Sequence, residues 1–571
     1  MNNYLKDTPE IESRLSCPLV RRIAGLRERD FADSAADPCA PENADGAMEN
    51  YLMLLELAGE LAATDIAAAS ASVDYEGTRC ENGRAVLPEA LQDNLRLLHQ
   101  AGLSGMTLPR EYGGLNMPFS VFCAVSEMIA RADASFQNVW GLQACADTIL
   151  EFGTEEQKRK YLPMVCAGAS MSMDLTEPGA GSDLQSVTLR ATEDTGNGCW
   201  RLDGVKRFIT NGDSDIHLVL ARSEEGTSDG RGLSLFIYDR RDGGVEVRRV
   251  EDKMGLHGSP TCELVFRNAR AELCGVRRMG LIKYVMSLMN GARLGIAAQS
   301  VGLCDAAWRE AVSYASVRCQ FGHPISEFPA VAQMLATMKA RLEASRSLLY
   351  RVAGHVDLCK ALDIIAAQGQ LSAEQKAESR SSGRMADALT PLAKFIVSEF
   401  ANQNAYDCVQ VHGGSGYMRG YRCERIYRDA RVTSIYEGTS QMQVVAALRY
   451  VMNGTYSRIV SDLLETMPES APVAGLKEMS LLLDRSVGTV ASWNSQEMTD
   501  YCSRRLVEIP ALCITAALLA ADASASPELL SVPCSVFLQW AGAQVAGHGE
   551  FIRNFTTDNL TDFRRYSGKS E

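Results

Sequence analysis

The order of residue patterns along this chain constrains its fold more than any other feature. Between about residues 169 and 280, short stretches that alternate apolar and polar residues are separated by clusters of Gly, Asp and Asn, as in VTLRAT, IHLVLARS and CELVFRN. Such alternation predicts β-strands. On both sides of this segment, apolar residues recur at the spacing of three and four that is typical of helices. We therefore expect a small, mostly antiparallel β-barrel or sandwich between helical regions.

A chain of 571 residues is too long for one simple core, so several domains are expected. The patterns divide it into an N-terminal extension (1–45), an N-terminal helical domain (46–168), the β domain (169–280), a C-terminal four-helix bundle (281–453) and an auxiliary helical segment (454–571). Four long helical patterns favour the bundle, with a polar interruption at 369–387. The predicted fold class is α+β and mainly α.

Composition and charge exclude several function classes. The chain has 57 basic and 71 acidic residues, which argues against nucleic acid or an anionic membrane as its main partner. Its 17 cysteines show no zinc-type spacing, so we expect buried free thiols in a reducing compartment and no metal site. The N-terminus lacks an apolar signal core, and the apolar run 511–521 is shorter than the about 20 residues that span a bilayer. A cytoplasmic protein without a transmembrane segment is expected.

Two segments of the β domain carry groups that suit a ligand. In the stretch 173–186, MDLTEPGAGSDLQS, glycines predict a tight turn, and Thr176 and Ser182 place hydroxyls beside a backbone that a ligand can approach. A plain surface turn explains the same pattern. In GVKRFITNG, Phe208 and Thr210 lie two apart on a strand and so face one side, where they could hold a flat heterocycle. Core packing explains Phe208 equally well.

Two further segments lie in the helical bundle. Arg318 and Phe321 have the i, i+3 spacing of a helix before a glycine stop. The glycines of QVHGGSG, among them Gly413 and Gly414, could offer backbone amides to a phosphate. We interpret His412 beside them as a hydrogen-bonded structural histidine rather than as a catalyst.

Five motifs occur together in the order, and near the spacing, of one known family. They are TEPGAGSD (176–183), FIT (208–210), RCQFG (318–322), QVHGGSG (410–416) and YEGTSQ (436–441). On these motifs, residues 48–452 resemble the acyl-CoA dehydrogenase family of flavoproteins. The resemblance implies FAD as the cofactor. The region 454–571 is then a C-terminal helical extension, which we interpret as a packed auxiliary bundle rather than as a membrane attachment.

The resemblance also implies particular FAD contacts. They are Met173, Leu175, Thr176, Gly181, Ser182, Phe208, Ile209, Thr210, Arg318, Phe321, Gln410, Gly413, Gly414, Thr439 and Gln441. In this family Gln410 and Gly414 reach the cofactor of a neighbouring subunit, which implies a homodimer or homotetramer. Many relatives carry Trp in place of Phe208, and the pair Phe328–Pro329 replaces a more polar family pair.

The resemblance assigns the catalytic base to Glu437. Removing hydrogen from Cα and Cβ of a thioester needs a base for the α-proton and an acceptor for the β-hydrogen, and apolar surroundings strengthen a carboxylate as a base. A second family position for the base corresponds to Ala292, which cannot accept a proton. We expect Ser440 and Gln443 to form a capping box behind Glu437. The implied substrate contacts are Ser182, Asn290, Arg293, Tyr436, Glu437 and Gly438, although a structural salt bridge would also explain Arg293.

The expected activity is FAD-dependent oxidation of an acyl-CoA to the trans-2-enoyl-CoA in fatty acid β-oxidation. An electron-transferring flavoprotein is the expected electron acceptor. Two alternatives stay open: an acyl-CoA oxidase that uses oxygen, and a catalytically silent scaffold that binds CoA esters. The preferred acyl chain length is not legible in the sequence.

Overall fold

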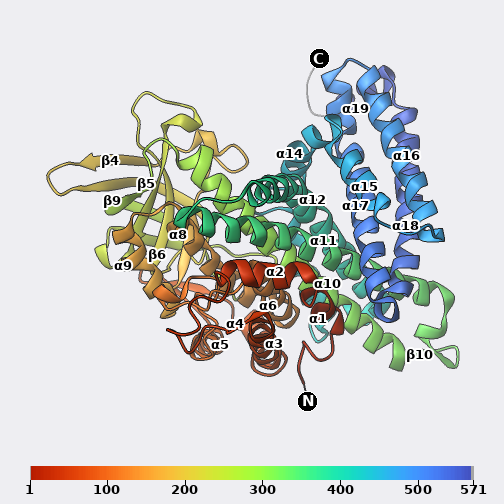
Figure 1. The fold of residues 1–571 in the computed structure, drawn as a ribbon, viewed down its shortest axis with the longest axis horizontal. Coiled ribbons are helices and arrows are strands. Elements are labelled where there is room, and N and C mark those ends of the chain that lie inside the picture. The colour runs from red at the N-terminus through yellow and green to blue at the C-terminus, as the bar shows by residue number, and fades with distance from the viewer. Residues whose placement is uncertain (1, 567–571) are drawn as a thin grey trace. The chain divides into compact units, whose positions relative to one another are not determined.

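The structure is a computed structural model and describes residues 2–566 (Figure 1). The chain forms two compact units, each with buried apolar residues of its own. Unit 1 comprises Met1–Leu303, Ala361–Gly369 and Arg428–Val432, and unit 2 comprises Cys304–Lys360, Gln370–Tyr427 and Thr433–Glu571.

Unit 1 begins with a helical region. Its helices are α1 (Pro9–Leu15), α2 (Pro18–Arg27), α3 (Ala44–Leu61), α4 (Ala67–Glu76), α5 (Glu89–Gln100), α6 (Phe119–Ala132), α7 (Ala134–Trp140), α8 (Ala146–Phe152) and α9 (Glu155–Cys166). Every residue of α6 is buried, so this helix forms the centre of the region. A short hairpin of β1 (Arg79–Glu81) and β2 (Arg84–Val86) interrupts the helices.

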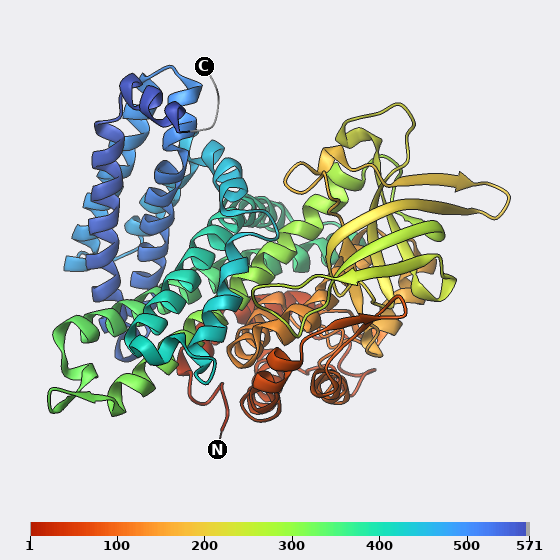
Figure 2. The same cartoon turned by 180° about the vertical axis from the view of Figure 1, so that it is seen from behind.

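The central strands close into a barrel. They are β3 (Met171–Asp174), β4 (Arg190–Asp194), β5 (Cys199–Thr210), β6 (Ile216–Arg222), β7 (Leu233–Asp239), β8 (Val245–Val250) and β9 (Thr261–Cys274). The order β6, β4, β5, β9, β7 returns to β6, and β3 and β8 pair with β6 and β9. All pairings except those of β6 with β3 and β4 are antiparallel, and β4 and β5 form the hairpin that extends from the barrel in Figure 2. The expected fold class, with its central β unit, is confirmed.

Strand β6 shows how the barrel builds two cores. Leu218 and Leu220 pack in a cluster with Ile149 of α8 and residues of α9, whereas Val219 packs inside the barrel with Phe236. Successive strand residues point to opposite faces, so a continuous apolar strand serves both cores. This is why the run LVLA (218–221) within IHLVLARS is continuously apolar rather than strictly alternating.

Long helices follow the barrel. They are α10 (Met286–Val317), α11 (Pro329–Gln368), α12 (Ala373–His412), α13 (Arg422–Arg431) and α14 (Ser440–Met452). A two-stranded turn of β10 (Cys319–Gln320) and β11 (His323–Pro324) joins α10 to α11. The predicted interruption at 369–387 is too long, because Ser372 and Gln375 form a capping box and α12 begins at Ala373.

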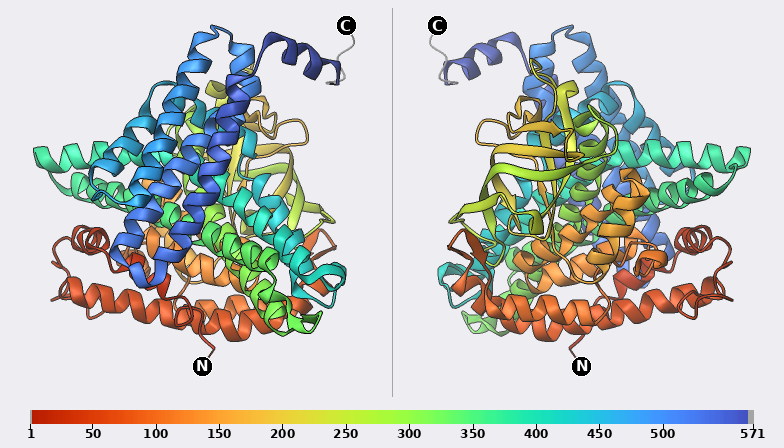
Figure 3. Two further views of the ribbon diagram at one scale, coloured as in Figure 1. Left: turned by 90° about the vertical axis from the view of Figure 1, so that its right-hand side faces the viewer. Right: turned by 90° about the vertical axis from the view of Figure 1, so that its left-hand side faces the viewer.

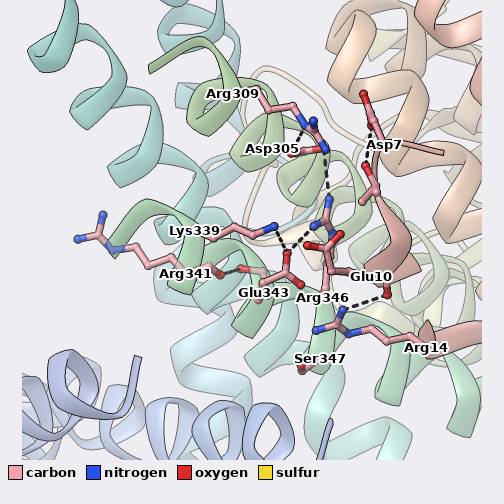
Figure 4. A network of polar contacts seen from close by, with 12 residues as sticks. Asp7, Glu10, Arg14, Asp305, Arg309, Lys339, Arg341, Glu343, Arg346 and Ser347 are labelled. Atoms are coloured by element: carbon pink, nitrogen blue, oxygen red, sulfur yellow. Dashed lines mark hydrogen bonds and ion pairs between the residues drawn. The ribbon is translucent and has the colours of Figure 1, made fainter. Parts of the chain in front are cut away.

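A network of buried charges lies in unit 2 (Figure 4). The fully buried Arg346 contacts Glu343 Oε1 at 2.6 Å and Asp305 Oδ2 at 3.2 Å. Lys339 Nζ also lies 2.8 Å from Glu343 Oε1, and Arg309 Nε lies 2.8 Å from Asp305 Oδ1. Each carboxylate thus has two cationic partners, as burial of charge requires. The network links the part of α10 that belongs to unit 2 with α11.

The C-terminal region adds five helices to unit 2. They are α15 (Thr455–Glu465), α16 (Ala471–Ser492), α17 (Gln496–Ala525), α18 (Pro527–Arg553) and α19 (Thr557–Arg565). Helices α16, α17 and α18 run side by side (Figure 3, blue). The region packs on α12, because Phe400 contacts the rings of Phe537 and Trp540, and the Tyr456 hydroxyl donates to Ala388 O at 2.7 Å.

Helices α17 and α18 are long and apolar enough to cross a membrane by length and composition alone. Core helices share these properties, and 78% of the apolar window of α17 is buried within the fold, against 33% for α18. The absence of a transmembrane segment therefore stays a prediction. All 17 cysteines are free thiols, and most are buried.

Candidate active site

The loop after β3 holds the first group of candidate residues in unit 1. Glu177 N donates to Ala180 O at 3.0 Å, and Ala180 N donates to Glu177 O at 3.1 Å, which closes the predicted tight turn. Thr176 is half-buried and Ser182 is exposed, and within residues 2–566 neither hydroxyl makes a hydrogen bond. Both hydroxyls are therefore available to a ligand. Gly181 is exposed, with open space where a Cβ would stand.

Phe208 lies at an irregularity of strand β5. The pairing of β5 with β9 shifts between Lys206 and Ile209, and Phe208 has a φ of 60°. The bulge turns Phe208 outward, so that it is 54% exposed, while Ile209 is buried and Thr210 is half-buried. The sequence predicted a shared face for Phe208 and Thr210 from regular alternation, whereas the exposure of Phe208 comes from the bulge.

Two implied cofactor contacts have buried side chains. Leu175 and Ile209 are 5% and 2% exposed, and Leu175 O accepts a hydrogen bond from the buried Lys206. Met173 in β3 is half-buried. The side chains of Leu175 and Ile209 therefore belong to the cores of unit 1.

The first turns of α10 carry the implied substrate residues of unit 1. Arg293 Nη1 donates to Asn290 Oδ1 at 3.0 Å, and both side chains are half-buried. Ala292 lies between them and is also half-buried. Because its side chain is a methyl group, this position of α10 offers no carboxylate.

The candidate residues Arg318 and Phe321 of unit 2 do not lie on a helix, which corrects the predicted helical spacing. Helix α10 ends at Val317, and Phe321–Gly322 is the two-residue turn between β10 and β11. Phe321 has a φ of 51° and Gly322 a φ of 88°, as a tight hairpin of this kind requires. The turn leaves the Phe321 ring 92% exposed.

The glycine motif of unit 2 follows directly on α12. Gln410 is exposed on the last turn, and the backbone of Gly413 and Gly414 is exposed in the short 3-10 helix Gly413–Tyr417. His412 is buried, its Nδ1 lies 2.8 Å from Cys408 O, and its ring stacks on Tyr314 at 4.2 Å. His412 is therefore a structural residue, as interpreted from the sequence.

Glu437 occupies a tightly held loop before α14. It has a φ of 54°, and Gly438 has a φ of 83°. The side-chain amide of Gln443 donates to Glu437 O at 3.3 Å and to Gly438 O at 3.1 Å. A Cβ at position 438 would lie 2.6 Å from Gln443 Nε2 and would stand on a left-handed backbone, so glycine is favoured there.

The predicted capping box of Ser440 and Gln443 is wrong. Thr439 is the N-cap, because its hydroxyl accepts from Met442 N at 3.3 Å, and Ser440 instead donates to Glu399 Oε1 at 2.6 Å. Tyr436 and Thr439 are half-buried and Gln441 is exposed on the first turn of α14. The clamp that Gln443 provides is not legible in the sequence, because a capping box and a loop clamp use the same residue type.

Three candidate residues share one unusual backbone feature. Phe208, Phe321 and Glu437 all have φ between 51° and 60°, in the left-handed region that residues with a Cβ rarely adopt. Such conformations cost on the order of 1–3 kcal/mol each and cluster at functional sites. Ten other non-glycine residues among those that the structure describes also have a positive φ, so the feature accompanies these candidates without singling them out.

Family models match nearly the whole chain. They are described as acyl-CoA dehydrogenase N-terminal domain (48–169), middle domain (172–269), C-terminal domain (282–361 and 359–451) and acyl-CoA dehydrogenase C terminal (452–560). An acyl-CoA dehydrogenase of Bacillus subtilis is 36% identical over 369 residues, which cover 63% of this chain and 90% of that protein. This chain belongs to the acyl-CoA dehydrogenase family. It is an oxidoreductase that acts on acyl-CoA.

This acyl-CoA dehydrogenase family member is also similar to a reductase and to a solved structure. A 3-(aryl)acrylate reductase of Clostridium sporogenes is 34% identical, over 61% of this chain and 87% of that protein. The crystal structure of an acyl-CoA dehydrogenase from Bacillus anthracis complexed with FAD has a TM-score of 0.74 and covers 91% of this chain and 92% of its own. At 23% identity this second likeness shows the fold, including the C-terminal region.

FAD is the cofactor of this family member, and the exposed groups fit it. Phe208 and Phe321 present aromatic rings to solvent, although such rings are usually buried. The Thr176 hydroxyl and the exposed backbone of Gly413 and Gly414 add hydrogen-bonding groups of the kind that a flavin edge and a pyrophosphate need. Among residues 2–566 no group of three or more His, Cys, Asp or Glu side chains could hold a metal ion.

Proposed function

We propose that this chain removes hydrogen from Cα and Cβ of an acyl-CoA thioester and so forms the trans-2-enoyl-CoA. The observation that carries the proposal is the loop of Glu437. Glu437 is half-buried, and its backbone has a left-handed conformation. It lies shortly before the N-terminus of α14.

Glu437 is the proposed base. Its carboxylate takes the α-proton of the thioester, and a positioned base of this kind accelerates proton transfer about 10²–10⁴-fold. The positive end of the α14 dipole favours the ionised carboxylate before reaction. The two hydrogen bonds from Gln443 hold the peptide groups of Glu437 and Gly438 and so limit the directions that the carboxylate can take.

FAD, when bound, supplies the acceptor for the β-hydrogen. Thr176 and Phe208 of unit 1 are proposed to hold it, through the groups described above. Phe321 of unit 2 is a separate proposed contact. The hydrogen-bonded pair of Arg293 and Asn290 is proposed to orient the acyl-CoA. Because the α-proton and the β-hydrogen leave on opposite faces of the substrate, the base and the cofactor must flank the same two carbons.

Substitution of the proposed base tests this function. E437Q should bind FAD as the wild type does, but its flavin absorption should not bleach when an acyl-CoA is added without an electron acceptor. The matched control is E465Q, which changes an exposed glutamate at the end of α15 and should bleach normally. Bleaching of E437Q at the wild-type rate would remove Glu437 from the mechanism.

The reductive direction is a second candidate, because one 34% identical relative is named a reductase. By microscopic reversibility Glu437 would then protonate Cα of an enoyl-CoA. Anaerobic mixing of the reduced protein with an enoyl-CoA, and separately of the oxidised protein with the saturated ester, measures both directions. The faster direction at equal ligand concentration identifies the working reaction.

We also propose an electron-transferring flavoprotein as the electron acceptor, a homo-oligomeric assembly and a role in fatty acid β-oxidation, as the family resemblance implies. A cytoplasmic location is proposed from the N-terminal composition and the dispersed cysteines. Rapid formation of peroxide on exposure of the reduced protein to air would instead favour the oxidase. A purified protein without flavin absorption would favour the silent scaffold. Because a methylene in an apolar pocket contributes only about 1–3 kcal/mol, the acyl chain length must come from a panel of short, medium and long acyl-CoAs.

A further inference from the structure

A buried ion pair lies directly behind the loop that carries Thr176. The Lys206 ammonium is fully buried, and it donates to Glu177 Oε1 at 2.9 Å and to Leu175 O at 2.9 Å. Leu175 and Glu177 are the two sequence neighbours of Thr176. One ammonium group therefore fixes the chain on both sides of this residue.

The Glu177 carboxylate extends the same contacts to the segment that leads into strand β4. It accepts from Thr188 N and Thr188 Oγ1, both at 2.7 Å, and from Leu189 N at 2.9 Å. With Lys206 it thus receives four hydrogen bonds while only 5% exposed. Burial alone would raise the pKa of the Glu177 carboxyl, but the Lys206 charge and these donors hold that pKa below its usual value.

Strand β5 connects this ion pair to the outward-facing aromatic ring. Lys206 is fully buried, Arg207 N donates to Thr176 O at 2.9 Å, and Phe208 follows at the bulge. Of these three consecutive residues, Lys206 binds the Thr176 loop through its side chain and Arg207 binds it through its backbone. The third, Phe208, presents its ring to solvent. The position of Thr176 relative to Phe208 is thereby set within unit 1.

We propose that Lys206 and Glu177 are positioning residues of the flavin site, which hold Thr176 in register with Phe208. The inference rests on the proposed flavin contact of Thr176. Neither charged side chain is exposed enough to touch a ligand, so their effect passes through the loop. A buried ion pair is weak evidence for stability, because its desolvation cost offsets much of its attraction, and this favours a positioning role.

The test compares K206M with K206M/E177Q. K206M leaves a carboxylate buried without its cation, so it should lower the melting temperature, whereas the double variant removes both charges and should recover most of the loss. If the pair positions Thr176, the double variant should still bind FAD at least about tenfold more weakly than the wild type. This factor corresponds to the free energy of about one to two hydrogen bonds. Its flavin absorption should also be shifted from that of the wild type.

The control is K160M, which breaks the exposed ion pair of Lys160 with Glu272 in the same unit and should leave FAD affinity unchanged. A double variant with the wild-type melting temperature, FAD affinity and flavin spectrum would overturn the inference. If the double variant does not fold, T188A decides: it removes one hydrogen bond to Glu177 from an exposed position, and should weaken FAD about threefold. Unchanged affinity of T188A would then overturn the inference.

The two proposals fail in different ways. A wild-type chain that binds no FAD would overturn the proposed function and this inference together. A wild-type chain that binds FAD, with variants that bind it equally well, would overturn only the role of Lys206 and Glu177.

Discussion

The side-chain amide of Gln443 donates a hydrogen bond to the backbone carbonyl of Glu437 across 3.3 Å. A second bond from the same amide reaches Gly438 O. Gln443, a residue of α14, therefore supports the loop that presents the proposed base Glu437. Both hydrogen bonds go to backbone carbonyls of this loop.

Loss of this support should slow turnover without releasing the cofactor. We expect Q443E, which places a carboxylate against two backbone carbonyls, to lower kcat by about tenfold or more, as small displacements of a reacting group do. FAD content should stay at the wild-type level. Q403E changes an exposed glutamine of α12 and serves as the control. Wild-type kcat in Q443E would show that the clamp does not matter to the reaction.

The stability of unit 1 should fall as pH rises from about 6.5, the usual pKa of histidine. A hydrogen bond to Asp74 raises the pKa of His257 in the folded state. A raised pKa stabilises the fold fully below the unfolded value, and this contribution is lost as pH passes the folded value. Urea unfolding at a series of pH values should show the decline in the wild type and a flatter profile in H257Q. An equal decline in H257Q would assign the effect to other groups.

The same cluster should also be sensitive to acid. Burial alone would raise the pKa of Asp74, but hydrogen bonds from His257 and Arg428 lower it far below its usual value. Arg428 binds both oxygens of Asp74, at 3.1 and 2.7 Å. A depressed carboxyl pKa gives stability that is lost as pH falls below about 4. In D74N the free energy of unfolding should lack this acid-dependent contribution. Urea unfolding at a series of pH values measures it.

Breaking the buried charge network should strongly destabilise unit 2. R346M leaves Glu343 and Asp305 with one fewer cation in the interior, and loss of one partner of a buried pair costs about 3–5 kcal/mol. K477M, which breaks an exposed pair with Glu469, should cost less than about 1 kcal/mol. Chemical denaturation compares the two. Equal free energies of unfolding would mean that the network contributes no more than a surface pair.

The packing of the C-terminal helices on α12 should be essential for stability. Phe400 is 1% exposed, with ring centroids 5.9 Å from Phe537 and 5.6 Å from Trp540. F400A should cost about 3–5 kcal/mol, as large cavities in a core do. Y406A, on the same helix but 58% exposed, should be nearly neutral. A small effect of F400A on the urea midpoint would indicate that the C-terminal helices dock loosely.

The sequence predicted the barrel and the long helices because both depend on the simple periodicity of apolar residues. It failed where one residue breaks the period. In a regular strand Lys206 and Phe208 would share a face, yet Lys206 is buried and Phe208 is exposed, because a bulge separates them. No residue type in GVKRFITNG indicates that bulge.

The turn at Phe321 and the cap at Thr439 were missed for related reasons. Two-residue hairpin turns favour Asn or Gly at the first position, so Phe–Gly does not resemble one. Thr439 and Ser440 are both good N-cap residues, and only the tertiary contact of Ser440 with Glu399 decides between them. The motifs located the candidate residues, but the contacts that support them, such as Lys206 and Gln443, belong to the folded chain.

The left-handed backbone at Phe208, Phe321 and Glu437 limits how this enzyme can be altered in the laboratory or by descent. Valine, isoleucine and threonine, which disfavour that conformation most, should be depleted at all three positions in any selected library, even where their size would be acceptable. Asparagine and glycine would be tolerated by the backbone but would bring neither a ring nor a base. These three positions are therefore restricted by their backbone conformation as well as by the groups that they present.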